Sequence, residues 1–171
     1  MSRSRNASED PSDDSVGATA RVSEDHHAGL WSTLVQRVDA VVAAVAADRD
    51  DLGTRHALIE FLRGDVMAHL QTEERFVYAA AAEIGSDALV ATLELDHRFL
   101  MDLVHQIARA DTLLQTALPA RALLTLVGLR IEKEENVLIP ALREAGVDVS
   151  ELLDGMVVAM STDYDSSFSY L

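Results

Sequence analysis

Apolar residues recur with a period close to 3.6 along most of the chain, and this pattern restricts the fold more than any other feature. Such a period is typical of amphipathic helices, and no segment shows the alternation of a half-buried strand. Four long helical segments joined by short connectors predict antiparallel neighbours. We therefore expect an all-α protein: an up-down-up-down four-helix bundle with a short fifth C-terminal helix.

Capping and breaker residues set the expected boundaries. The bundle should span 23–146, with helices that begin at Ser23, after the break at 48–53, behind Ser86 and near Pro119. An accessory helix is expected within 147–160. The segments 1–22 and 161–171 are rich in Ser and Asp, and such segments bury too little apolar surface to offset the entropy of ordering. We expect them to be a disordered N-terminal tail and a flexible C-terminal tail.

The composition excludes several classes of protein. The 171 residues include 14 basic and 29 acidic side chains, a formal net charge of −15, and no cysteine. Nucleic-acid binding needs a basic face, which a chain this acidic lacks. Without cysteine there are no disulfides and no thiolate metal sites. No stretch reaches the ~20 apolar residues of a membrane span, and there is no apolar signal core. We expect a cytoplasmic protein without nucleic-acid or membrane partners.

Each predicted helix of the bundle carries polar residues on its inward, apolar face. These residues are His27 in the first helix, His69 and Glu73 in the second, His97 in the third, and Arg130 and Glu134 in the fourth. Unpaired buried carboxylates are costly, so these side chains need partners. Reflecting each residue through its connector puts the set at a similar height in the bundle. We therefore expect these side chains to converge in the interior.

The spacing within the second helix indicates metal binding. His69 and Glu73 are four positions apart, so both lie on one helical face, one turn apart, and can bind a common ion. Imidazole and carboxylate without thiolate suit iron, manganese or zinc. We expect iron, with coordination positions open for oxygen chemistry.

Several fragments together carry a family resemblance. They are His27 with the apolar residues after it, His69-Leu-Gln-Thr-Glu73-Glu74, Leu95-Asp96-His97-Arg98, and Glu132-Lys133-Glu134-Glu135-Asn136-Val137-Leu138-Ile139-Pro140. In their order and spacing they resemble the hemerythrin-like (HHE cation-binding) family. The resemblance implies a di-iron centre with bridging carboxylates, whose ligands here would be His27, His69, Glu73, His97 and Glu134. It also implies a protein that binds or senses dioxygen, nitric oxide or peroxide, or buffers iron.

Position 130 departs from the family pattern. The resemblance implies a histidine there, but the chain has Arg130, whose guanidinium stays charged and does not bind iron. Three outcomes stay open. One ion could remain on His27, His69 and the carboxylates while Arg130 pairs with Glu134 or Glu73. Alternatively, the metal could be lost, with buried Arg–Glu pairs fixing the register of the bundle. A second, weaker iron site could also form near His97.

Other residues offer alternative interpretations. Glu24-x-x-His27 and Glu94-x-x-His97, with Glu73 and Glu134, match the ligand pattern of ferritin-like di-iron carboxylate proteins, although this leaves His69 without a role. His26 is the alternative ligand from the first helix. Four residues adjacent to the inward faces or at other heights are expected at the surface: His56, His105, Glu74 and Glu135.

Three functional classes remain. The first is a non-haem iron protein that binds a small gas or oxidant and acts as sensor, carrier or iron buffer. The second is an enzyme that consumes peroxide or nitric oxide at the same iron, although no dedicated acid–base residue is recognisable. The third is a metal-free interaction module. The amphipathic fifth helix either caps the bundle or, with the tails, contacts a partner or a second copy of the chain.

Overall fold

The computed structural model describes residues 11–49 and 51–167, and this part of the chain contains helices and no strand. The first two long segments are α1 (Pro11–Ala46) and a run of α2 (Leu52–Phe61), η1 (Leu62–Val66), α3 (Met67–Glu73), η2 (Glu74–Tyr78) and α4 (Ala79–Glu83). The last two are α5 (Asp87–Arg109) and a run of α6 (Leu113–Lys133), η3 (Glu134–Leu138) and α7 (Ile139–Glu144), after which α8 (Val149–Ser167) follows. The predicted all-α bundle with a fifth helix is confirmed.

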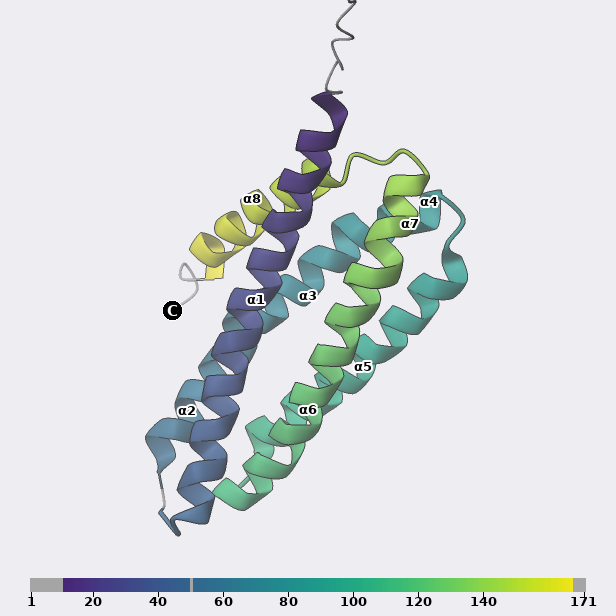
Figure 1. Cartoon of the computed structure of the whole chain (residues 1–171). Helices are drawn as coiled ribbons and strands as arrows, with labels where there is room; N and C mark the ends of the chain where they lie inside the picture. The colour runs from purple at the N-terminus through teal and green to yellow at the C-terminus, as the bar shows by residue number, and fades with distance from the viewer. Residues whose placement is uncertain (1–10, 50, 168–171) are drawn as a thin grey trace, which may run out of the picture.

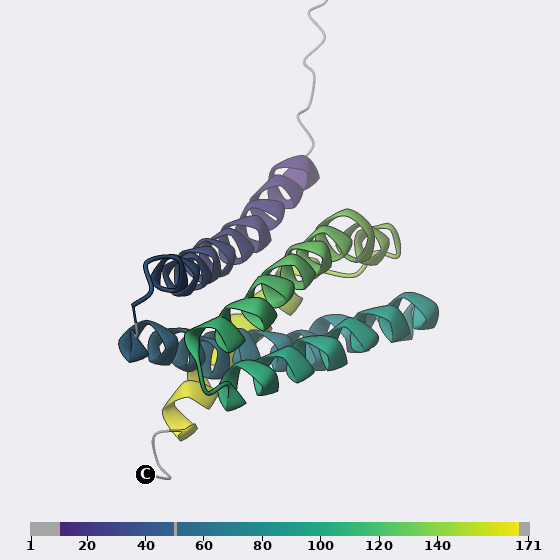
Figure 2. The ribbon, with the colours of Figure 1, turned by 90° about the horizontal axis from the view of Figure 1, so that it is seen from below.

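The long segments run alternately up and down and close into a bundle (Figure 1). Helix α1 contacts α2 and α6, and α5 contacts α4 and α6, so the first and last long segments are neighbours. The view from below shows the four segments around a common interior (Figure 2). Helix α8 crosses this bundle and packs on α1, α3, η2 and α7, as expected for a cap. Among the described residues, we find no helix with the length and apolarity to cross a membrane.

Two predicted tails are shorter than expected. Helix α1 begins at Pro11, so 11–22 continues the first helix instead of being disordered. Proline is favoured in a first turn, and a helix that is already packed elongates at little cost until a residue breaks it. Helix α8 likewise continues to Ser167. The remainders of both predicted tails, 1–10 and 168–171, lie outside the described residues.

The fourth long segment begins earlier than the position of Pro119 suggests. Thr112 and Gln115 form a capping box: the Gln115 amide donates to Thr112 Oγ1 (3.2 Å), and the Thr112 amide donates to Gln115 Oε1 (3.3 Å). This cap starts α6 at Leu113 and leaves Pro119 inside the helix. The prediction that Pro119 occupies the first turn is therefore wrong.

Two of the three π-helical turns begin at or just after a carboxylate of the bundle interior. The η2 turn begins just after Glu73, and η3 begins at Glu134. In an α-helix the fifth residue after an inward position points about 140° away. A π-helical turn accommodates one more residue per turn, so both the fourth and fifth residues face inward. Thus Val77 and Tyr78 are both buried after Glu73.

A polar layer divides the apolar core into two clusters. In the run from α3 to η2, Leu70 packs in one cluster, Glu73 follows, and Val77 packs in the other. The same order of apolar, polar and apolar residues occurs in α5 and in the run from α6 to η3. The second cluster contains Val149 and Met156 from α8. The layer itself contains the six buried residues identified from the sequence: His27, His69, Glu73, His97, Arg130 and Glu134.

Candidate metal centre

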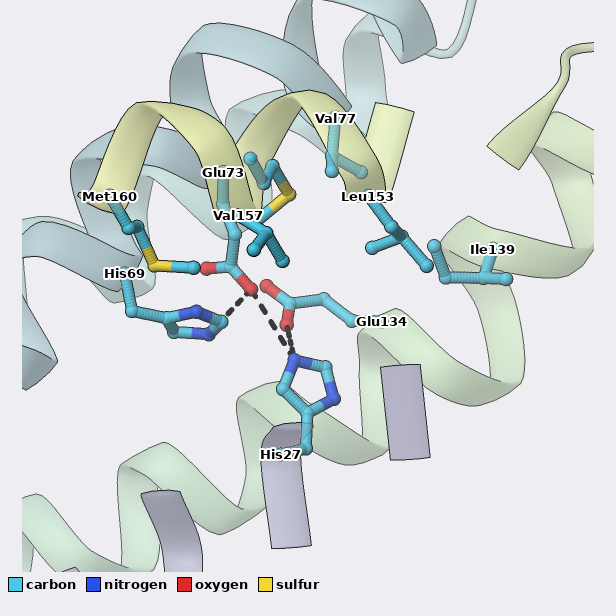
Figure 3. Close-up of a pocket in the computed structure, with 10 residues that line it drawn as sticks. His27, His69, Glu73, Val77, Glu134, Ile139, Leu153, Val157 and Met160 are labelled. Atoms are coloured by element: carbon cyan, nitrogen blue, oxygen red, sulfur yellow. Dashed lines mark ion pairs between the residues drawn. The ribbon is translucent and has the colours of Figure 1, made fainter. Parts of the chain in front are cut away.

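The imidazole of His27 enters the layer from α1 and is oriented by two of its neighbours. Its Nδ1 donates to Glu135 Oε1 at 2.8 Å. This contact directs Nε2 toward Glu73 Oε1 (3.5 Å) and Glu134 Oε2 (3.7 Å), as Figure 3 shows. A carboxylate behind the Nδ1 of a histidine fixes its tautomer and raises its basicity, which is the usual arrangement behind a metal-bound imidazole.

His69 and Glu73 complete a three-residue cluster with His27. His69 Nε2 lies 2.8 Å from Glu73 Oε1, one helical turn along α3. The His27 and His69 rings meet edge to face, with centroids 5.3 Å apart. One potential ligand atom from each of the three residues lies within 4.8 Å of the others. The predicted convergence of these side chains is therefore present.

The donor chemistry of this cluster fits one cation. Two imidazoles and one carboxylate, without thiolate, are the facial set found in non-haem iron(II) sites with open positions. All three side chains are more than nine-tenths buried. A buried carboxylate between two imidazoles is well placed to neutralise part of the charge of an ion.

Arg130 occupies the other side of the carboxylates. Its guanidinium pairs with Glu73 Oε2 and, through Nε, with Glu134 Oε1 at 2.9 Å. It also donates to the Tyr78 hydroxyl from Nε (3.0 Å) and Nη2 (2.6 Å), and that hydroxyl donates to Glu134 Oε1 (2.9 Å). Arg130 is 2% exposed. A permanent cation therefore lies among the groups that a second ion would need, and the full di-iron ligand set does not fit.

His97 lies outside the cluster. Its Nδ1 donates to Glu74 Oε1, and its ring centroid is 6.2 Å from that of Tyr78. Its Nε2 is buried and has no hydrogen-bond partner among the described residues. Of the five predicted ligands, the structure thus brings His27, His69 and Glu73 together with Glu134 at their edge, and it places His97 beyond Tyr78 and Arg130.

In the absence of metal, the cluster retains protons. Burial disfavours the charged form of His27, but hydrogen bonds to Glu73 and Glu135 and the charges of Glu73 and Glu134 raise its pKa to about 9. Burial and the nearby charge of Glu73 raise the pKa of Glu134 to about 8. A metal ion that binds His27 must therefore displace a proton.

The pKa values of Glu73 and His97 are both lowered, which favours the charged form of Glu73 and the neutral form of His97. Burial tends to raise the pKa of Glu73, but the charges of His69 and Arg130 hold it well below its usual range. Burial and the charge of Arg130 lower the pKa of His97. The layer therefore keeps one ionised carboxylate, Glu73, between the imidazoles and the guanidinium.

Three contributors to this layer were missed from the sequence. Glu135 and Glu74 were expected at the surface, yet each accepts a hydrogen bond from the Nδ1 of a buried histidine, while their side chains remain 29% and 49% exposed. Tyr78, which links Arg130 to Glu134, was not singled out. The repeated Glu-Glu pairs in the sequence are the one signal that could have suggested the first two.

The other residues considered from the sequence differ in whether the structure supports their predicted roles. Glu94 is exposed, which contradicts the ferritin-like interpretation at that position, whereas His56 and His105 are exposed as expected. The side chains of Glu24 and His26 lie outside the described part of the chain.

A small cavity of about 30 Å³ adjoins the cluster. Its polar wall is formed by four residues of the layer, His27, His69, Glu73 and Glu134. Its apolar wall contains Val77 and Ile139 and four residues of α8: Leu153, Met156, Val157 and Met160. Figure 3 shows the α8 side chains facing the imidazoles and carboxylates across this space. The fifth helix therefore forms one side of the candidate site.

Comparison with known proteins agrees with this geometry. A search of curated proteins and a search of solved structures each gave no match. A family model described as the hemerythrin HHE cation binding domain matches residues 19–142. This match covers most of the chain and all of the polar layer. The chain therefore belongs to the hemerythrin HHE cation-binding domain family.

Proposed function

We propose that the protein binds a single iron ion through His27, His69 and Glu73 and admits a small ligand such as dioxygen, nitric oxide or peroxide beside it. The observation that carries the proposal is the cluster of two imidazoles and one carboxylate at the wall of a small cavity. Membership of a cation-binding family supports a metal. When bound, iron supplies a coordination position for the small ligand.

The surrounding residues have separate tasks in this proposal. Glu135 fixes the ring of His27, and Arg130 holds Oε2 of Glu73 so that Oε1 faces the imidazoles. Glu134, whose pKa is raised to about 8, holds a proton at the cavity wall near neutral pH. That proton can stabilise an anionic ligand by hydrogen bonding.

The cavity favours small, weakly polar ligands. A volume of about 30 Å³ accommodates a ligand of two or three heavy atoms. Apolar side chains of α8 form one side of the cavity and limit the contact of the site with water, which strengthens electrostatic interactions there. A gas or peroxide ligand fits both properties.

A second candidate is a metal-free module. Arg130 already pairs with Glu73 and also contacts Glu134, so the layer has a charge partner without an ion. In that case the buried pairs would fix the register of the bundle, and the acidic surface would provide the function.

Metal content distinguishes the two candidates. We expect about one iron per chain by elemental analysis of protein produced with iron and purified without chelator or affinity metal. His69→Ala should lose the iron, whereas His56→Ala, which changes an exposed histidine, should retain it. About two irons would show that Arg130 does not prevent a pair. No iron in a folded helical protein would favour the metal-free module.

A further inference from the structure

Helix α8 places two thioethers in the wall of the metal cavity. Met156, 3% exposed, and Met160 both line it. Figure 3 shows the Met160 side chain extending toward His69 and Glu73. The other methionines within the described residues, Met67 and Met101, do not line this cavity.

Thioethers are the oxidisable groups of this wall, since the chain has no cysteine. In a reaction with hydrogen peroxide, a lone pair of the sulfur attacks one peroxide oxygen and the O–O bond breaks. The departing hydroxide takes up the proton, so one sulfoxide and one water form. The sulfur loses two electrons and the peroxide gains them.

Next to Met156, α8 packs closely on η2. Gly155 of α8 packs so tightly against η2 that a Cβ atom there would lie 3.0 Å from Phe76 Cε1. A sulfoxide on Met156 would place a polar group among apolar side chains, where burial without a hydrogen bond is costly. Since α8 is held to α1 and α3 through this wall, the oxidation weakens its attachment.

We propose that Met156 and Met160 are oxidation sites through which peroxide drawn to the metal centre loosens α8 from the bundle. The inference rests on the proposed function, because the bound ion is what concentrates peroxide in the cavity. Proximity then makes these two thioethers react ahead of those elsewhere in the chain.

The test compares the four internal methionines of the full chain. Iron-loaded and metal-free protein are exposed to hydrogen peroxide, and sulfoxide at each methionine is followed by peptide mass spectrometry. We expect oxidation of Met156 and Met160 to be about tenfold faster than that of Met67 and Met101 in the iron-loaded protein, and not in the metal-free protein. Hydrogen exchange of 149–160 should rise after oxidation.

Substitutions separate oxidation from its structural consequence. The double variant Met156→Leu, Met160→Leu keeps apolar volume and should show no peroxide-induced rise in α8 exchange, whereas Met67→Leu should behave as the parent. Met156→Gln, which introduces a polar group of similar length, should raise α8 exchange without peroxide.

The possible outcomes distinguish selective oxidation, loosening of α8 and iron binding. Equal oxidation of all four methionines in protein that contains iron would overturn the inference and leave the proposed function intact. Selective oxidation without a rise in α8 exchange would overturn the loosening. A folded chain that takes up no iron would overturn both the inference and the proposed function.

Discussion

The two oxygens of Glu73 face opposite environments. Oε1 faces the imidazoles of His27 and His69 beside the cavity, whereas Oε2 faces the guanidinium of Arg130 and, beyond it, Tyr78. The imidazole side offers lone pairs that an ion can use. On the guanidinium side, a permanent cation already occupies the space between carboxylates. Glu73 therefore lies between an imidazole side, where an ion could bind, and a guanidinium side, where Arg130 already supplies a positive charge.

This difference shows how the negative charge of the buried carboxylates is compensated. A symmetric pair of ions would require ligands on both sides, but Arg130 supplies one positive charge that cannot dissociate or be chelated. The acidic layer is thus partly neutralised before any ion arrives. We infer that Arg130 stabilises the layer in the metal-free state and would restrict a bound ion to the imidazole side.

Replacing Glu73 should have the largest effect, because it removes the link between both sides. Glu73→Ala leaves Glu134 as the one carboxylate that pairs with Arg130 within the described part of the chain, and it removes the anionic ligand. We expect the metal-free protein to lose about 3 kcal/mol of unfolding free energy in urea, as for other broken buried pairs, and to bind no iron. Glu83→Ala, at an exposed glutamate of α4, is the matched control. Equal losses in the two variants would argue against a buried pair.

Replacing Arg130 by a histidine should have the next largest effect, because it exchanges a fixed cation for a potential metal ligand. Arg130→His gives the guanidinium side an imidazole beside Glu134 and near His97, whose Nε2 lacks a hydrogen-bond partner among the described residues. We expect iron to rise from about one to about two per chain, with the near-ultraviolet absorption of a bridged iron pair. Arg130→Lys keeps the charge without a ligand and should stay near one. Unchanged iron in Arg130→His would contradict the role assigned to Arg130.

A smaller effect should appear as pH rises in the metal-free protein. The pKa of His27 is raised to about 9 and that of Glu134 to about 8, so the native state holds more protons than the unfolded state between pH 7 and 9. Stability should therefore fall across this window, by about 2 kcal/mol, in urea titrations.

Bound metal should remove the contribution of His27 to this fall, because it holds His27 in the deprotonated form. A metal-free stability that stays level or rises from pH 7 to 9 would show that His27 and Glu134 do not retain these protons.

Much of the bundle and half of the site could be predicted from periodicity. The inward faces identified His69, Glu73 and Glu134 because buried polar residues interrupt apolar rows, and reflection through short connectors placed His27 level with them. The α6 start was missed although Thr112 and Gln115 carry a capping signal, because Pro119 also suits a first turn.

The remaining features depend on tertiary structure. A 3.6-residue period places Tyr78 away from Glu73, and only the π-helical turn brings it into the layer. Glu135 and Glu74 lie about 100° from the inward faces, where solvent exposure is the ordinary expectation. They reach His27 and His97 because those rings turn their Nδ1 atoms toward the rim, which no pattern within one helix can show.

The division of the apolar core has a consequence for how the chain unfolds. The polar layer separates the cluster that contains Leu138, Leu142 and Met156 from the cluster around Leu34 and Leu123. Such regions behave as separate cooperative units with different opening free energies. An ion held by His27, His69 and Glu73 lies between the units and binds only when both are folded. Metal binding should therefore raise the free energy for opening either cluster.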